Sequence, residues 1–156
     1  MANTSNQKGN ELEYVASLLF EGLTMMSVRD QNLQTKTGEI DIILEYNGFD
    51  GLNFFDYYSR FILVECKNTA DPVPAKEVGY FRSKLRDSNV DLGLLISWNG
   101  VTGEKSERHG ERAASQSSLD DPLLLILTSR DLYSILDGKS LYKLLDEKLY
   151  AQRFDL

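Results

Sequence analysis

The sequence predicts an α/β sandwich in which helices flank a central mixed β-sheet. Two kinds of segment favour this class. In some, apolar residues recur at the three- and four-residue spacing of amphipathic helices, while others alternate in polarity or run continuously apolar as strands do. These segments follow one another in the order helix, three strands, helix, strand, helix, strand, helix, which is typical of α/β folds.

The first half of the chain predicts one helix followed by strands. The segment 11–22 has apolar residues at helical spacing and ends at a glycine. Glycines, asparagines and aromatic residues over 46–60 predict an elongated hairpin loop, and 61–68 follows as an apolar strand. The segment 39–44 alternates as a strand, with Asp41 on one face and three apolar residues on the other: Ile40, Ile42 and Leu44.

The second half alternates helices with buried strands. A helix is expected over 74–88, where Val78, Phe81 and Leu85 recur at helical spacing. The remaining elements are expected as a strand over 92–98, a polar helix over 104–118, a strand over 123–127, and two short helices over 130–136 and 140–150.

The composition is that of a folded globular domain. The chain has 156 residues, of which 42% are hydrophobic and 26% charged, and we expect a polar leader over 1–8 and a single domain over 9–156. The longest apolar run is too short to cross a bilayer and the N-terminus is unlike a signal sequence, so a cytoplasmic protein without membrane contact is expected. With one cysteine, Cys66, and one histidine, His109, a disulfide framework, a zinc site and histidine catalysis are not expected.

Acidic and basic residues at the end of the 61–68 strand suggest a metal site. Strand alternation places Glu65 and Lys67 on one face and Cys66 on the other. A neighbouring strand offers Asp41, so Asp41 and Glu65 could converge on one divalent cation, Mg²⁺ or Mn²⁺. Lys67 could then orient a water or neutralise charge developing on a phosphate. An ordinary surface ion pair is the alternative explanation of the same residues.

Three motifs in order resemble those of the PD-(D/E)xK nuclease superfamily. Two later segments make the catalytic domain of Mrr-type restriction endonucleases the nearest match within it. The three motifs are Gly9-x-x-Leu12-Glu13, Gly38-Glu39-Ile40-Asp41-Ile42-Ile43 and Val64-Glu65-Cys66-Lys67. The later segments are Gly93-Leu94-Leu95-Ile96-Ser97-Trp98-Asn99-Gly100-Val101-Thr102 and Leu125-Ile126-Leu127-Thr128-Ser129-Arg130-Asp131-Leu132.

The resemblance implies a restriction-endonuclease-like fold with an αβββαβ core and an αβα extension. It further implies a metal-dependent endodeoxyribonuclease of restriction or defence type, with DNA as its substrate and Mg²⁺ or Mn²⁺ as its cofactor. Asp41 and Glu65 would be metal ligands, the backbone carbonyl of Cys66 a third ligand, and Lys67 the catalytic lysine. Glu13 would be the first-helix acid that supports the metal site.

The acidic net charge of −7 argues against a non-specific nucleic-acid coat, because affinity for phosphate comes mainly from lysine and arginine. Basic residues nevertheless gather on the 74–88 helix, where DNA-backbone contact and ordinary helix surface are equally good explanations. The four candidates are Lys76, Arg82, Lys84 and Arg86.

Two other functions fit the sequence. An inactive nuclease-fold domain could serve as a protein-binding or assembly module, and a related nuclease could resolve Holliday junctions. A homodimer is one expected assembly, since cutting both DNA strands usually needs two active sites. A separate DNA-recognition or protein partner is the other. The 46–60 loop could contact substrate or a partner through exposed aromatic residues: Phe54, Phe55, Tyr57 and Tyr58.

Overall fold

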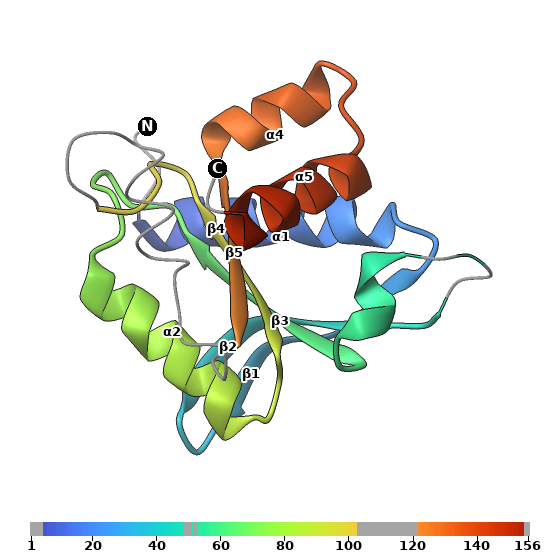
Figure 1. Ribbon diagram of the computed structural model, residues 1–156. Coiled ribbons are helices and arrows are strands. Elements are labelled where there is room, and N and C mark those ends of the chain that lie inside the picture. Colours follow the sequence, from blue (N-terminus) through green and yellow to red (C-terminus); the bar gives the residue numbers. More distant parts are fainter. Residues whose placement is uncertain (1–4, 49–50, 52, 103–121, 155–156) are drawn as a thin grey trace.

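A computed structural model describes residues 5–48, 51, 53–102 and 122–154 (Figure 1). In chain order the elements are α1 (Ser5–Glu21), β1 (Met26–Thr35), β2 (Gly38–Tyr46), the 3₁₀ helix η1 (Phe54–Tyr57), β3 (Phe61–Lys67), α2 (Ala75–Asp87), β4 (Leu92–Ser97), β5 (Leu123–Thr128), α4 (Ser129–Leu136) and α5 (Leu141–Arg153). The helix expected over 104–118 and His109 lie outside the described residues.

The five strands form one mixed sheet in the order β1-β2-β3-β4-β5. The first three strands pair antiparallel and the last three pair parallel. A parallel pair needs a crossover connection, and α2 supplies it between β3 and β4. The ends of β3 and β4 therefore lie at the same edge of the sheet, which confirms the predicted α/β fold with a central mixed sheet.

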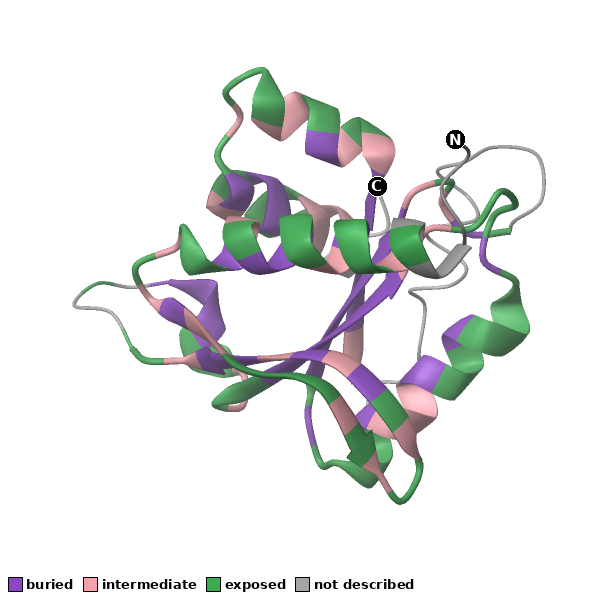
Figure 2. Ribbon diagram, turned by 180° about the vertical axis from the view of Figure 1, so that it is seen from behind, coloured by how far each residue is buried: buried purple, intermediate pink, exposed green. Residues whose placement is uncertain are grey.

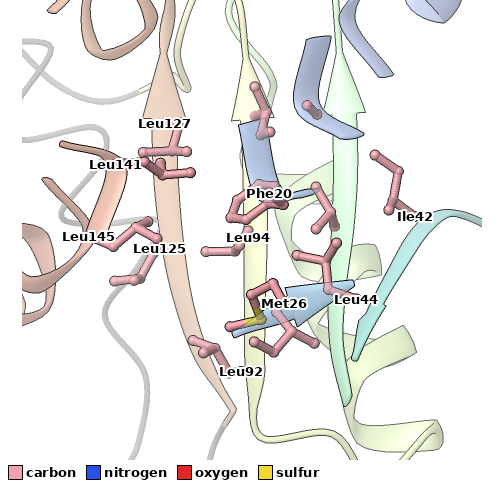
Figure 3. Close-up of a cluster of buried hydrophobic side chains, with 14 of the residues drawn as sticks. Phe20, Met26, Ile42, Leu44, Leu92, Leu94, Leu125, Leu127, Leu141 and Leu145 are labelled. Atoms are coloured by element: carbon pink, nitrogen blue, oxygen red, sulfur yellow. The ribbon is translucent and has the colours of Figure 1, made fainter. Parts of the chain in front are cut away.

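Helices cover both faces of this sheet (Figures 1 and 2). On one face, α1, α4 and α5 pack against the strands through the larger hydrophobic cluster. Because helices cover both faces, the central strands are almost wholly buried, as Figure 2 shows. Members of the larger cluster are labelled in Figure 3: Phe20, Met26, Ile42, Leu44, Leu92, Leu94, Leu125, Leu127, Leu141 and Leu145.

Among the described helices, α2 is the one that packs on the opposite face, through the predicted stripe of Val78, Phe81 and Leu85. Gly93 in β4 permits this close packing, since a Cβ built there would lie 2.5 Å from Leu85 Cδ1. The stripe confirms the helix predicted over 74–88. It also fixes α2 beside the end of β3, where the predicted acids lie.

The main differences from the predicted element ranges lie at α1 and β1. Helix α1 begins at Ser5 instead of residue 11. The residues before Leu12 are polar, so they belong to the helix without extending the apolar pattern that predicts it. Strand β1 had no predicted range, although three strands were expected before the second helix. Its exposed middle residues do not alternate in polarity.

The face predicted for strand β2 is wrong in part. Ile42 and Leu44 pack in the larger cluster as expected, but Ile40 packs in the cluster under α2. Pairing of β2 with β3 covers only Ile42 to Glu45, and the earlier residues of β2 pair with β1 alone. The β1–β2 hairpin is thus free to turn away from the plane of the sheet before Ile42.

The aromatic loop also differs from the prediction. Phe54 and Phe55 are buried, whereas Tyr57 is exposed. Asn53 caps η1 by accepting the Phe55 N–H at 2.9 Å, and the resulting turn packs Phe54 on Tyr142 of α5, with ring centroids 5.2 Å apart. Two of the four residues expected to be exposed are therefore buried.

No helix in the described part of the chain is long and apolar enough to span a bilayer.

Candidate active site

The predicted site lies where strands β2 and β3 separate. Their last paired residues are Ile42 and Val64. Beyond that point the Asp41 side chain takes the place of a strand partner, because its Oδ2 accepts the backbone N–H of Cys66 at 2.7 Å. The carboxylate of Asp41 is therefore fixed next to the stretch of backbone that carries Glu65 and Cys66.

Strand β3 places its side chains on the predicted faces. Val64 and Cys66 belong to the larger cluster, whereas Leu63 packs under α2, so Glu65 and Lys67 point to the α2 side. Cys66 is buried, and its thiol pKa is raised by desolvation and by the nearby carboxylates. Cys66 is therefore a buried residue of the core and not a reactive thiol.

Glu65 is a buried carboxylate with a lysine on each oxygen. The ammonium of Lys67 lies 3.1 Å from Oε1, and that of Lys84 lies 2.9 Å from Oε2. Only 6% of Glu65 is exposed, and so a carboxylate without such partners would cost several kcal/mol here. Lys67 also reaches Glu77 of α2 at 3.8 Å.

Asp41 carries negative charge that the protein does not fully compensate. Its pKa is raised from 3.8 to about 6, first by partial burial and then by the charge of Glu65, with a smaller contribution from Glu13. The Cys66 N–H and Lys67 oppose the shift without cancelling it. A group of this kind is stabilised by any cation that binds beside it.

Glu13 of α1 interacts electrostatically with the same site. Burial raises the pKa of Glu13, the Asn32 side chain lowers it, and the charges of Glu39 and Glu65 raise it further. With its NH₂ group turned toward the acids, Asn32 donates to Glu13 Oε2 and Glu39 Oε1, at 3.2 Å each. Asn32 is thus the residue that holds Glu13 at the site.

Sequence reasoning missed both Asn32 and the contact between Lys84 and Glu65. Asn32 lies in the strand that had no predicted range, and its φ of 51° is a left-handed conformation that asparagine tolerates better than most residues. The sequence indicates Lys84 only as one of four basic residues on a helix. Its contact with Glu65 depends on where α2 packs, which the sequence does not reveal.

The four basic residues of α2 do not form one patch. At 3.6 residues per turn, Arg82 lies roughly 160° around the helix from Lys84, and Arg86 follows Arg82 on the same flank. Lys76 is exposed and stands over the Tyr80 ring, 5.6 Å from its centroid. Lys84 contacts Glu65, one of the two predicted metal ligands.

Clefts flank the end of β3 on both faces of the sheet. The cleft on the α2 side has a volume of about 500 Å³ and is lined by Thr37, Glu65, Lys67, Glu77, Tyr80, Phe81, Ser83, Lys84 and Asp87. The cleft on the α1 side has a volume of about 540 Å³ and is lined by Glu11, Leu12, Val15, Asn68, Thr69, Ala70, Trp98, Asn99 and Leu132. Both are large enough for parts of a nucleotide.

The donor set fits a hard divalent cation. Within the described residues no three His, Cys, Asp or Glu side chains form a metal-binding group, so Glu13 is not a third ligand beside Asp41 and Glu65 in this arrangement. Two carboxylates remain, with backbone oxygen nearby, and magnesium usually binds through one or two carboxylates with water in the other positions. The incompletely compensated charge on Asp41 agrees with such an ion.

The raised pKa of Asp41 predicts a pH-dependent cost to stability. A proton on Asp41 stabilises the folded state below about pH 4, and this contribution is lost as the pH rises through about 6. In metal-free buffer, Asp41→Asn should therefore be more stable than the wild type at pH 8, by at most about 3 kcal/mol because the carboxylate is only partly buried. Chemical denaturation at pH 8 and pH 4 measures this difference, which should vanish at pH 4. An equal difference at both pH values would contradict the assignment.

The fold and this cluster together define a nuclease domain of the PD-(D/E)xK class: a mixed sheet, an acid where β2 leaves β3, and an acid and a lysine two residues apart on β3. Comparison with protein families supports the same class, because residues 4–127 match the Mrr catalytic domain family of restriction endonucleases. The chain belongs to this family, as its motifs predict. A search of curated proteins gave no match.

Proposed function

We propose that the chain is a metal-dependent endodeoxyribonuclease of restriction or defence type that hydrolyses phosphodiester bonds of DNA. The observation that carries the proposal is the position of Asp41, fixed by Cys66 N–H at 2.7 Å beside a buried Glu65 that is paired with Lys67. An ordinary surface ion pair between Glu65 and Lys67 would not explain why Asp41 is held beside them with a raised pKa.

Asp41 and Glu65 would hold Mg²⁺ or Mn²⁺, with the carbonyl of Cys66 as a further ligand. When bound, the ion supplies an acidified water and positive charge next to the scissile phosphate. The buried backbone of β3 keeps Glu65 and the Cys66 carbonyl rigid, and the N–H of Cys66 orients the carboxylate of Asp41. Ligands held in this way need little reorganisation on binding.

Lys67 would stabilise negative charge on the phosphate as a cation. Desolvation lowers its pKa, but the carboxylates of Glu65, Asp41 and Glu77 outweigh that effect, so the pKa is raised overall. Lys67 therefore stays protonated at neutral pH and is unsuited to act as a general base. Its ammonium can instead compensate the charge that develops on the phosphate oxygens in the transition state.

Glu13 would support the site from α1. Its carboxylate is held by Asn32, and its pKa is raised partly by Glu65. From this place it can bind a metal-bound water or a second cation more readily than it can share the ion of Asp41. Its loss should weaken the reaction less than the loss of either main ligand.

Cleavage assays with defined substrates test the proposal. Purified protein should cut plasmid or linear DNA when Mg²⁺ or Mn²⁺ is present and leave it intact when EDTA is added. A four-way junction in the same assay separates a junction resolvase from a restriction-type nuclease, since a resolvase would cut the junction and spare linear duplex. If plasmid, linear, single-stranded and branched DNA all stay intact beside an active control nuclease, the proposal is wrong.

We also propose that the bases of α2 outside the site, Lys76, Arg82 and Arg86, contact DNA phosphates. Replacing Arg82 and Arg86 together by alanine should reduce the slope of log affinity against log salt by about two, because each arginine would neutralise about one phosphate. Fluorescence anisotropy with a labelled duplex over a range of salt concentrations measures the slope. Lys143→Ala on α5, on the other side of the sheet, is the matched control. An unchanged slope in the double variant would remove both arginines from the interface.

A protein-binding module is the second candidate function. The observation in its favour is a pocket of about 300 Å³ between η1 and α5, lined by Phe54, Tyr57, Tyr58, Asp146, Leu149, Tyr150 and Phe154. Metal titration separates the two candidates. A wild-type chain that binds neither Mg²⁺ nor Mn²⁺, and that is unaffected by Asp41→Ala, would favour the binding module.

A further inference from the structure

We propose that Lys84 is an internal counter-ion that holds Glu65 in place before the metal binds and competes with the metal for it. Lys84 is then a positioning residue and not a DNA contact. The inference rests on the proposed metal-dependent function. It concerns one ion pair, between the ammonium of Lys84 on α2 and Oε2 of Glu65 on β3, which are 2.9 Å apart.

The Lys84 ammonium is fixed at two points. Besides Glu65 it donates to the backbone carbonyl of Glu39 at 2.6 Å, two residues before Asp41 on β2. One side chain thereby connects α2 with both strands that carry the acid pair. A cation that bridges these three elements sets the distance between Glu65 and the start of β2.

Burial explains why Glu65 needs a second cation. The side chain of Glu65 is only 8% exposed, and Lys67 satisfies just one of its two oxygens. An incompletely paired carboxylate at this depth is strongly destabilising, while a second ammonium on the other oxygen compensates it. Lys84 therefore supplies, in the metal-free protein, the charge that a divalent cation would supply at Glu65.

The surroundings of Lys84 argue against phosphate contact. Its side chain is 18% exposed and its ammonium is already bonded to two acceptors inside the protein. Lys76, in contrast, is exposed on the outer side of the same helix. Two of the three N–H donors of the Lys84 ammonium are thus already used inside the protein, and a DNA phosphate would compete with Glu65 for its charge.

Competition follows from the charges. Oε2 of Glu65 interacts less strongly with a dication while it is paired with Lys84. The ammonium and the dication also repel each other at this short distance. Removing the ammonium should thus weaken the metal-free fold and strengthen metal binding. A purely structural lysine would affect stability alone, and a DNA-binding lysine would affect DNA affinity alone.

The test compares the full-length wild type with Lys84→Met, Lys84→Arg and, as a matched control on α5, Lys143→Met. Isothermal titration with Mn²⁺ should give a dissociation constant about tenfold lower for Lys84→Met than for the wild type. Thermal denaturation in EDTA should give a lower melting temperature for Lys84→Met, and saturating Mn²⁺ should remove most of this difference. Lys84→Arg and Lys143→Met should stay close to the wild type in both measurements.

The possible outcomes separate the inference from the proposed function. Metal affinity that is unchanged or weaker in Lys84→Met overturns the inference and leaves the nuclease proposal intact, provided that the wild type binds Mn²⁺. A wild type that binds no Mn²⁺ removes the proposed function and the inference with it. If Lys84→Met folds only with Mn²⁺, the inference is supported. If it does not fold at all, Lys84→Gln, which can still donate to the Glu39 carbonyl, is titrated instead and judged by the same change in affinity.

Discussion

Replacing Asp41 by asparagine is expected to lower the rate of DNA cleavage at saturating Mg²⁺ by about 1,000-fold or more. The change removes the charge of one metal ligand but preserves the shape of the side chain. An asparagine oxygen can still accept the N–H of Cys66, so strands β2 and β3 should separate at the same place. Because the charge on Asp41 is only partly compensated in the metal-free protein, the variant should fold at least as well as the wild type.

The measurement is the single-turnover rate on linear duplex DNA, with circular dichroism to verify folding. Asp137→Asn, an exposed acid at the end of α4, is the matched control and should cut at the wild-type rate. A folded Asp41→Asn variant that cuts as fast as this control would show that the acid pair is not the catalytic centre.

Replacing Lys67 by methionine should lower the cleavage rate by roughly 100- to 1,000-fold without weakening metal binding. The reason is that Lys67 contributes a charge that the phosphate needs in the transition state, whereas the metal needs only the carboxylates. Loss of the ammonium 3.1 Å from Glu65 also removes a competitor for that carboxylate, so affinity for Mn²⁺ should be equal or higher. Arginine is not an adequate substitute, since its planar group distributes the charge differently.

Rates at saturating metal and isothermal titration with Mn²⁺ separate the two effects for Lys67→Met. A normal rate at saturating metal, together with weaker metal binding, would mean that Lys67 only organises Glu65. Lys143→Met serves again as the control for loss of a lysine elsewhere on the surface.

Short-range patterns were enough to predict most of the fold. The two-residue alternation of β3 put Glu65 and Lys67 together on the side opposite Cys66, and the structure confirms those faces because β3 is regular from end to end. The buried stripe of α2 was equally clear, since each of its members faces the sheet.

Features that depend on tertiary packing could not be predicted. The middle of β1 shows no alternation in polarity because it lies exposed at the edge of the sheet. The sequence therefore did not predict that Asn32 of this strand holds Glu13. Phe54 sits in a segment rich in glycine and asparagine, and its burial depends on Tyr142, far away in the sequence. Lys84 meets Glu65 only because α2 crosses beside the end of β3.

A crystal structure with bound Mn²⁺ tests the central claim most directly, because the anomalous signal of manganese locates the ion independently of the protein. We predict one peak between β2 and β3, with carboxylate oxygens of Asp41 and Glu65 at about 2.0 to 2.2 Å from it. Lys84 should have moved away from Glu65 in the same structure. Fully occupied manganese elsewhere, with Glu65 still paired to both lysines, would contradict the account.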